Sequence, residues 1–256
     1  MMLCLDVGNT HIFAGVCSEQ QIRLRVRYPS DQACTSDVLG LFFRNALREN
    51  GIDPSQITAI AISSVVPALG YTISAACKKY FSIDPIEIHA GLNTGITLDV
   101  TYPTEVGADR ITNAVAATYY YPNRNILLLD FGTATTVCAI SKQKAFLGGA
   151  ILPGFKLCME ALASKTAKLS AVNILKCEYA LGKQTTTNIQ SGLYYGQLGA
   201  VKEIIQRIQQ EAFAEDPAIV IATGGYSHLF EGEDLFEHIH PDLVLEGLRL
   251  ILEQQK

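Results

Sequence analysis

The chain has 256 residues and a formal net charge of −5, with 48% hydrophobic and 18% charged residues. This composition excludes an intrinsically disordered chain, because abundant apolar residues and few charges support a packed core. The acidic balance argues against a general nucleic-acid binder and against a polybasic membrane binder. A small anionic substrate remains compatible with it, since a local site can be positive on an acidic protein.

No apolar run approaches the roughly 18 residues that a membrane span requires. The N-terminal sequence MMLCLDVGNT has no basic leader and contains an acidic residue at Asp6, which is unlike a signal peptide. Seven dispersed cysteines without a C-x-x-C pair are typical of reduced core packing. We therefore expect a cytoplasmic protein that binds neither nucleic acid nor membranes, built as one large domain or two smaller ones.

The first part of the chain predicts three consecutive strands, followed by alternating helices and strands. The predicted strands are 3–7, 11–17, 22–28, 57–66 and 86–89, and the predicted helices are 37–50, 67–81 and 105–121. Alternating apolar residues indicate the strands, and Ser18 to Gln21 reads as the turn between the second and third. Apolar residues at helical spacing indicate the first helix, which Gly51 ends, and Pro67 is a favourable first residue for the second helix.

A similar pattern restarts after Pro122 and Asn123. The predicted strands are 125–130, 136–141, 145–151 and 218–222, and the predicted helices are 155–164, 189–214 and 242–255. Interleaved strands and helices imply an α/β fold built in layers.

This restart is an internal repeat, because residues 3–16 can be laid without a gap on residues 127–140. Two Leu, an Asp and a Gly coincide, and nearly every other position keeps its apolar or small polar character. Each copy is an apolar strand that ends in Asp, then a Gly turn, then a second strand. We predict two domains of similar topology, residues 1–122 and 123–256, with a ligand-binding cleft between them.

The segment Asp6-Val7-Gly8-Asn9-Thr10 combines a carboxylate, a Gly turn with backbone N–H groups and a hydroxyl. Such a loop can hold phosphate oxygens together with a metal ion, and hard oxygen ligands suit Mg²⁺. Taken alone, the segment favours a plain β-hairpin turn. The second copy, at 130–136, favours a nucleotide-phosphate clamp made by the two loops. Walker, dinucleotide-binding and protein-kinase signatures are absent from the sequence.

The segment Gly107-Ala108-Asp109-Arg110 opens the Ala-rich helix. Asp109 could orient an acceptor hydroxyl, and Arg110 could hold an anionic group. The helix dipole favours the carboxylate form of Asp109, which predicts a base of low pKa. Helix stabilisation by an N-terminal Asp is an equally physical alternative.

The remaining motifs carry weaker signals. The Gly-rich segments 148–154 and 223–225 are predicted loops that could admit a nucleotide base or ribose, or simply sharp turns. One of the threonines at 185–187 is expected to cap the long helix that follows. His238 and His240 have no third metal ligand nearby, which favours a solvated loop over a zinc site. The tyrosines at 119–121 and 194–195 indicate helix-face packing, with a subunit interface as the alternative.

Seven motifs in this order resemble the type III pantothenate kinases of the actin/Hsp70/sugar-kinase superfamily. They are DVGNT (6–10), EVGADR (105–110), DFGTATT (130–136), GGAILPG (148–154), GKQT (182–185), SGLYYG (191–196) and TGG (223–225). The resemblance covers essentially the whole chain. It implies two ribonuclease-H-like (actin-like ATPase) α/β domains, a homodimer, and transfer of the ATP γ-phosphate to the primary hydroxyl of pantothenate, the first step of coenzyme A synthesis.

The resemblance also implies roles for individual residues. The ATP phosphate loop would comprise Asp6, Val7, Gly8, Asn9, Thr10, His11, Ile12 and Phe13, with Thr133 as a further ATP contact. The pantothenate site would comprise Gly107, Ala108, Asp109 and Arg110, with Asp109 as the catalytic base. Thr185 matches a pantothenate contact that comes from the other half, in a family that works as a dimer. Asp130 matches the ligand of an activating monovalent cation, K⁺ or NH₄⁺, and Asp6 would act on the Mg²⁺ of ATP indirectly.

The chain departs from the family pattern at Val100, seven residues before Gly107, where the family usually has Tyr. Tyr102 stands two positions on. Val100 thus marks a pantothenate contact at which a hydrogen bond or a wall of the site is lost or re-routed.

Two other functions stay open. One is another small-molecule kinase or a phosphohydrolase on the same fold, because a fold does not fix a function. The other is a nucleotide-binding regulatory accessory protein, against which the intact Asp6, Asp109 and Asp130 argue. Phosphate loss from ATP without an acceptor would favour the hydrolase, and co-purification with a partner without turnover would favour the regulator.

Overall fold

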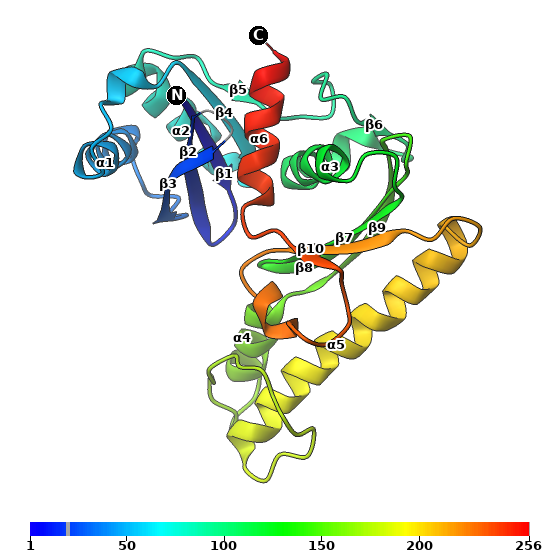
Figure 1. Ribbon diagram of the computed structural model, residues 1–256. Helices are drawn as coiled ribbons and strands as arrows, with labels where there is room; N and C mark the ends of the chain where they lie inside the picture. The colour runs from blue at the N-terminus through cyan, green and yellow to red at the C-terminus, as the bar shows by residue number, and fades with distance from the viewer. Residues whose placement is uncertain (19–20, 256) are drawn as a thin grey trace. The chain divides into compact units, whose positions relative to one another are not determined.

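The computed structural model describes residues 1–18 and 21–255, and the chain divides into two compact units (Figure 1). Unit 1 comprises Met1–Tyr120 together with the segment that begins at Leu243, and unit 2 comprises Tyr121–Asp242. The predicted turn over Ser18 to Gln21 includes Glu19 and Gln20, which lie outside the described residues. None of the described helices is long and apolar enough to cross a membrane.

Unit 1 contains a five-stranded sheet. Its strands are β1 (Met2–Val7), β2 (His11–Ser18), β3 (Gln21–Pro29), β4 (Ala59–Ser64) and β5 (Ile86–Glu87), in the order β3-β2-β1-β4-β5. The first three strands pair antiparallel, whereas β4 pairs parallel with β1 and β5 parallel with β4. The helices are α1 (Ser36–Glu49), α2 (Pro67–Phe81), α3 (Ala108–Tyr120) and α6 (Leu243–Gln254), and a short strand, β6, spans Thr97–Leu98. Short 3-10 turns lie at Pro54–Gln56 and Pro103–Glu105.

The side-chain alternation of β1 separates the two faces of this sheet. Leu3, Leu5 and Val7 belong to a buried core cluster that also contains apolar side chains of α1 and α2. The opposite face carries small residues, and α6 packs there so closely that a Cβ at Gly15 of β2 would meet Leu245. Two helices on each face therefore bury both sides of the sheet.

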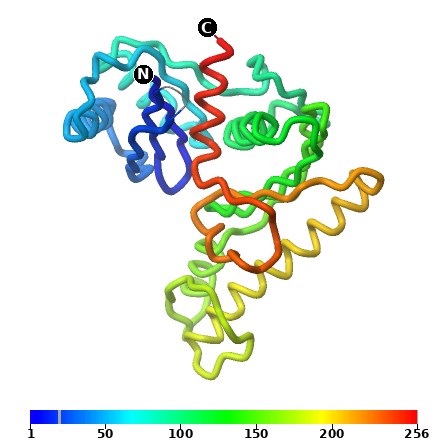
Figure 2. Tube along the Cα trace, in the orientation of Figure 1, coloured from blue at the N-terminus to red at the C-terminus, as the bar shows by residue number. Residues whose placement is uncertain are grey.

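Unit 2 repeats this arrangement. Its strands are β7 (Ile126–Phe131), β8 (Ala134–Ile140), β9 (Ala145–Pro153), β10 (Ile219–Thr223) and β11 (His238–Ile239), paired in the order β11-β10-β7-β8-β9. The helices are α4 (Phe155–Lys165) and α5 (Thr185–Ala212), and a 3-10 turn lies at Ser227–Phe230. The stretch 166–184 contains no helix or strand and runs beside α5 (Figure 2), tied to it by hydrogen bonds such as Gln190 Nε2 to Asn173 O at 2.9 Å.

Equivalent strands occupy equivalent places in the two sheets, which confirms the predicted α/β fold of two similar halves. The gapless repeat is correct for β1 and β7 but wrong by one residue in the next strand. Asp6 pairs with Phe13, seven residues on, whereas Asp130 pairs with Thr136, six residues on. The turn of unit 2 is therefore one residue shorter than that of unit 1.

The units differ from the predicted division at residue 122 in one element. Helix α6 follows β11 in the chain but packs on α3, β1 and β4 of unit 1 (Figure 1). Gly247 permits this packing, because a Cβ there would collide with the carbonyl oxygen of Thr112 in α3. Because α6 follows residue 122 in the chain, it was predicted to belong to the second half, whereas its apolar face is buried in unit 1.

Candidate functional site

Asp6 lies half-buried near the end of β1, at the start of the DVGNT turn. The Gly8 N–H donates to His11 O at 3.1 Å and so closes the turn. Asn9 and His11 are exposed, whereas the side chains of Val7 and Ile12 belong to the core cluster. Of the predicted phosphate-loop residues, Val7 and Ile12 thus hold the strands in place, and the turn between them forms the outer surface.

The end of β3 holds this turn from the side. Ser30 Oγ donates to Gly8 O at 2.5 Å, and the Ser30 N–H donates to Thr10 O at 3.1 Å. Sequence reasoning missed Ser30, because its contact depends on the pairing of β3 with β2. The two hydrogen bonds fix the conformation of a loop whose glycine alone would leave it flexible.

A row of four residues crosses one face of the sheet at the level of Asp6. In register order it runs Ser63 (β4), Asp6 (β1), Phe13 (β2) and Arg27 (β3). Ser63 Oγ donates to Asp6 Oδ1 at 3.1 Å. The Arg27 guanidinium lies over the Phe13 ring, 4.1 Å from its centroid, as a cation–π pair. The Asp6 carboxylate is thus held by Ser63 of β4, and the positive charge of Arg27 lies two strands away on β3.

Asp109 lies in the first turn of α3 and is half-buried. Its Oδ1 accepts the backbone N–H of Arg110 at 2.8 Å. Burial raises the pKa of the Asp109 carboxyl, and the Arg110 N–H and its positive charge offset only part of that rise. The predicted low pKa is therefore wrong, because desolvation outweighs the helix N-terminus here.

Gly107 allows the Asp109 carboxylate to fold back against the start of the helix. A Cβ at Gly107 would collide with Asp109 Oδ1 and would also touch Val65, which follows β4. Val65 is two residues beyond Ser63, the partner of Asp6. Unit 1 thus brings the DVGNT turn and the GADR segment to the same end of one sheet.

The second Asp–Gly turn lies in unit 2 and has the same closing hydrogen bond, from Gly132 N to Ala134 O at 3.1 Å. Asp130 Oδ1 packs against Gly224, whose φ of 89° and crowded surroundings both require glycine. Gly154 is equally required, because a Cβ there would collide with the carbonyl of Thr133. The TGG and GGAILPG motifs therefore shape the backbone around Asp130 and Thr133.

Helix α5 supports this second turn through the buried amide of Gln197. Gln197 Oε1 accepts from Thr135 Oγ1 at 3.0 Å, and its Nε2 donates to Pro153 O at 2.6 Å. The two contacts link α5 to the start of β8, just after the turn, and to the end of β9. Nothing in the local sequence singles out Gln197, since its partners lie more than 40 residues away.

Thr185 is exposed and is the first residue of α5. The predicted cap among the threonines is wrong: Gln184 is the N-cap residue, and its N–H donates to Thr187 Oγ1 at 3.1 Å. A groove of about 560 Å³ beside Thr187 is lined in part by Tyr179 and Leu181, whose side chains are 71% and 80% exposed.

Val100 lies half-buried in a bend, whereas Tyr102 is 64% exposed.

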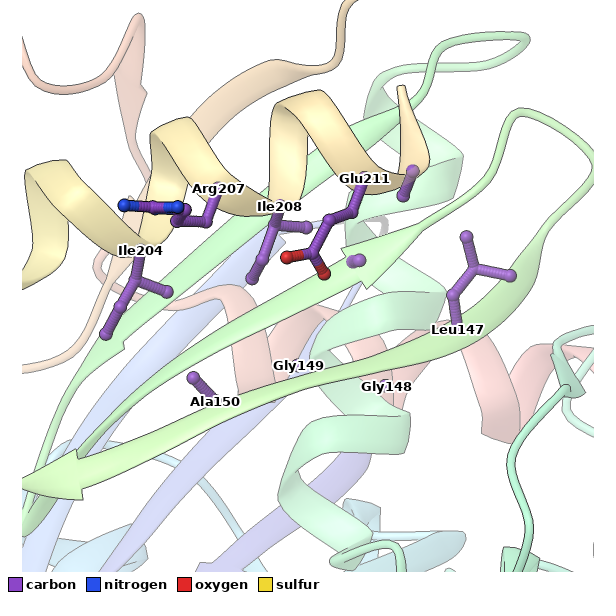
Figure 3. Close-up of a pocket in the computed structure, with 10 residues that line it drawn as sticks. Leu147, Gly148, Gly149, Ala150, Ile204, Arg207, Ile208 and Glu211 are labelled. Carbon is purple, nitrogen blue, oxygen red and sulfur yellow. The ribbon is translucent and has the colours of Figure 1, made fainter. Parts of the chain in front are cut away.

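The segment from Gly148 to Pro153 is part of strand β9, which confirms the predicted strand 145–151 and shows that the interpretation of 148–154 as a loop is wrong. Gly148 and Gly149 instead line a cavity of about 290 Å³ between β9 and α5 (Figure 3). Ile204 and Ile208 of α5 point toward the strand across this cavity. None of the predicted site residues lines it.

The two histidines near the end of unit 2 form an aromatic cluster rather than a solvated loop. His238 lies in β11, and its ring stacks on that of Tyr121 with centroids 5.6 Å apart. His240 Nε2 lies 2.7 Å from the Tyr121 hydroxyl. Burial and the neighbouring His238 lower the pKa of His240. Tyr121 therefore packs within unit 2, whereas Tyr119 and Tyr120 lie on α3.

A model of the family "type III pantothenate kinase" matches residues 2–207 of the chain. The chain belongs to the type III pantothenate kinase family. It is 54% identical to the type III pantothenate kinase of Legionella pneumophila over 250 residues, which cover 98% of this chain and 97% of that relative. It is 53% identical to type III pantothenate kinase 1 of Francisella tularensis subsp. holarctica over 256 residues, the full length of both chains.

The fold of this type III pantothenate kinase family member extends beyond the family. A candidate N-acetylmannosamine kinase of Listeria monocytogenes superimposes with a TM-score of 0.53 at 13% identity, covering 100% of this chain and 99% of the other. At that identity the likeness concerns the fold alone. The predicted family and the predicted actin-like kinase fold are both confirmed.

Proposed function

We propose that this chain is an ATP-dependent pantothenate kinase, which transfers the γ-phosphate of ATP to the primary hydroxyl of pantothenate. One observation supports this most strongly. In this chain, unit 1 brings the half-buried Asp109 carboxyl, whose pKa is raised, to the same end of the sheet as Asp6, which lies near the end of β1. A base and a phosphate loop are the two parts that phosphoryl transfer to an alcohol requires.

Asp109 is the proposed base. In the reaction a bond forms between the pantothenate hydroxyl oxygen and the γ-phosphorus, and the bond from that phosphorus to the oxygen of ADP breaks. The hydroxyl proton passes to the Asp109 carboxylate. Because the Arg110 N–H donates to Oδ1, the carboxylate is held in one orientation. A raised pKa suits the role, since a base accepts a proton more readily when its pKa lies nearer the working pH.

The segment 107–110 is the proposed pantothenate site. The Arg110 guanidinium supplies positive charge for the carboxylate of pantothenate. Gly107 leaves room for the Asp109 carboxylate, because a Cβ at position 107 would collide with its Oδ1. In this proposal Val100 takes the position of the usual Tyr without its hydroxyl, and Tyr102, two residues on and 64% exposed, is the tyrosine nearest to it in the chain.

The DVGNT turn, from Asp6 to Phe13, and Thr133 are the proposed contacts of ATP. The carboxylate of Asp6 fits the magnesium of ATP·Mg²⁺, because Mg²⁺ prefers hard oxygen ligands and keeps several of its waters. Bound Mg²⁺ would neutralise charge on the phosphate oxygens. The fixed turn supplies the scaffold: Ser30 holds the carbonyl of Gly8, and Ser63 holds Asp6.

Asp130 is the proposed ligand of an activating K⁺ or NH₄⁺ ion. Its carboxylate is half-buried and packs against Gly224, where a Cβ would collide with Oδ1. Oxygen donors are also the ligands that alkali cations take. A positive ion at this place would offset charge on the transferring phosphoryl group.

A homodimer in the cytoplasm completes the proposal, with Thr185 contacting the pantothenate bound by the partner subunit. Support comes from the exposed apolar side chains of Leu175, Tyr179 and Leu181 close to Thr185 in the chain, since such side chains gather at interfaces. The seven cysteines are free thiols, even Cys4 and Cys17 with sulfur atoms 3.9 Å apart, which is typical of a reducing compartment.

The test is release of ADP from ATP·Mg²⁺ with and without pantothenate, in Na⁺ and then in K⁺ or NH₄⁺ buffer. Release that requires both pantothenate and K⁺ or NH₄⁺ is the expected result. Release indifferent to pantothenate would contradict the proposal in favour of a phosphohydrolase or another acceptor. No release under any cation would favour a nucleotide-binding regulator.

A further inference from the structure

Ser63 is a buried hydroxyl residue that none of the recognised motifs contains. It lies opposite Asp6 in the parallel register of β4 and β1, and its side chain is 0% exposed. A buried hydroxyl without a partner costs about 1–3 kcal/mol, so this position requires a hydrogen bond. Ser63 Oγ makes it by donating to Asp6 Oδ1 at 3.1 Å.

The packing of the sheet does not itself require a hydroxyl here. The two preceding residues on the same face of β4, Ala59 and Ala61, are alanines, and the strand accommodates them. An alanine at position 63 would remove the burial problem along with the hydroxyl. The serine is therefore explained by what its hydroxyl does for Asp6.

The second sheet provides an internal comparison. Thr223 of β10 is the equivalent of Ser63, since it lies opposite Asp130. Its Oγ1 donates to His240 O at 2.7 Å, within unit 2. Both repeats thus keep a hydroxyl beside the strand-ending Asp, but only in unit 1 is that hydroxyl seen to donate to the carboxylate.

We infer that Ser63 is a positioning residue, which holds the Asp6 carboxylate in the orientation in which it acts on the magnesium of ATP·Mg²⁺. The inference rests on the proposed function, because that function gives Asp6 its role. A hydrogen bond to one carboxylate oxygen restricts the rotation of the group and directs the other oxygen. Loss of such a supporting contact typically reduces metal affinity or activity by about 10–100-fold.

The experiment measures the affinity of the full chain for the non-hydrolysable analogue AMP-PNP by calorimetry, with Mg²⁺ and in EDTA. The ratio of the two affinities is the magnesium enhancement. Ser63→Ala is expected to lower this enhancement by about tenfold or more while leaving the affinity in EDTA unchanged. Ser63→Thr, which keeps the hydroxyl, is expected to restore it.

Ser64→Ala is the matched control. Ser64 is the next residue of β4, its side chain points to the other face, and its Oγ accepts from Val66 N at 3.2 Å. This variant is expected to keep the wild-type enhancement. Asp6→Asn is expected to lose it, which links the effect to the carboxylate.

The inference is overturned if Ser63→Ala keeps the wild-type enhancement, if Ser64→Ala loses as much, or if Asp6→Asn keeps it. If Ser63→Ala fails to fold by circular dichroism, Ser63→Cys decides instead, because a thiol of similar size is a weak donor and is expected to lose the enhancement. Pantothenate-dependent ADP release by the wild-type chain tests the proposed function separately. The proposed function can therefore be confirmed by ADP release whether or not Ser63→Ala loses the magnesium enhancement.

Discussion

Asp6 and Asp130 occupy equivalent positions in the two sheets, yet a different group lies against each carboxylate. The Ser63 hydroxyl donates to Asp6, whereas Asp130 packs against the bare Cα of Gly224. The turns that follow close with the same backbone hydrogen bond from Gly8 and from Gly132. Equivalent turns thus support two carboxylates in different surroundings, which agrees with different proposed ligands for them.

The first prediction concerns Asp109 as the base. Asp109→Asn is expected to lower pantothenate-dependent turnover about 100-fold or more, because an amide cannot accept the proton. ATP affinity is expected to change little. In the wild type, kcat/KM should fall as pH decreases through a value above the ordinary pKa of Asp, since burial raises the pKa of this carboxyl.

Steady-state kinetics and a pH profile of kcat/KM check this expectation. Asp84→Asn is the control, because Asp84 is 79% exposed and pairs with Lys78 on the surface. Near-normal turnover by Asp109→Asn would remove Asp109 from the mechanism.

The second prediction concerns the loss of folding stability that the buried Asp109 carboxylate causes. Its folded-state pKa lies above the unfolded value, so the folded chain keeps the proton over a pH range in which the unfolded chain has lost it. Stability therefore falls as pH rises through that range and remains lower at neutral pH. Asp109→Asn removes the buried charge and should raise the melting temperature at pH 7.

Thermal unfolding at pH 7, followed by circular dichroism, measures the effect. Asp84→Asn should leave the melting temperature nearly unchanged, since its carboxyl remains in water. A decrease for Asp109→Asn would mean that the carboxylate stabilises the fold, contrary to its burial.

The third prediction concerns the contact between α6 and α3. Gly247→Ala is expected to destabilise the chain by about 1–3 kcal/mol, because the new methyl group would collide with the Thr112 carbonyl. Gly70→Ala, in α2, meets no atom within 4 Å and is expected to stabilise by about 0.5–1 kcal/mol, as Ala does in a helix. Urea denaturation of the two variants should therefore give shifts of opposite sign, and equal signs would contradict the packing.

The fourth prediction concerns the proposed contribution of Thr185 to the partner's site. Asp109→Asn and Thr185→Ala chains are each expected to be nearly inactive alone. Mixed and allowed to exchange subunits, they form dimers in which one of the two sites has both residues intact. Statistical pairing should return about a quarter of wild-type activity. Recovery should be absent if Thr185 serves the site of its own subunit, and light scattering on the same samples reports the oligomeric state.

The order of the larger elements could be predicted from the sequence, because each carries its own period of apolar residues. The strand from Met2 to Val7 and the helix from Pro67 to Phe81 lie within one residue of their predicted bounds. The two-residue strands β6 and β11 were not predicted, since a pair of residues has no period, whereas the equally short β5 lies within the predicted strand 86–89. The strand 145–151 was predicted, but the glycines of 148–154 also suggested a loop, whereas Gly149 relieves crowding in the strand beside Val137.

The candidate site was predictable only where a motif marks it. Asp6, Asp109 and Asp130 belong to such motifs, but the direction of the Asp109 pKa depends on burial, which no local pattern encodes. Ser63 and Gln197 escaped prediction for a related reason. Their partners are brought to them by strand register and by helix packing across 57 and 62 residues of chain, respectively.

The return of α6 to unit 1 has a consequence for how the protein is made. Unit 2 is inserted between two parts of unit 1, so a ribosome completes unit 2 before it has synthesised Leu243–Gln254. Until then the face of the first sheet that carries Gly15 lacks the helix that covers it. Although domains usually fold in the order of synthesis, here the unit that begins first is completed last. The inner strands β1 and β4, which carry Asp6 and Ser63, therefore acquire the packing of α6 only after the second turn has been synthesised.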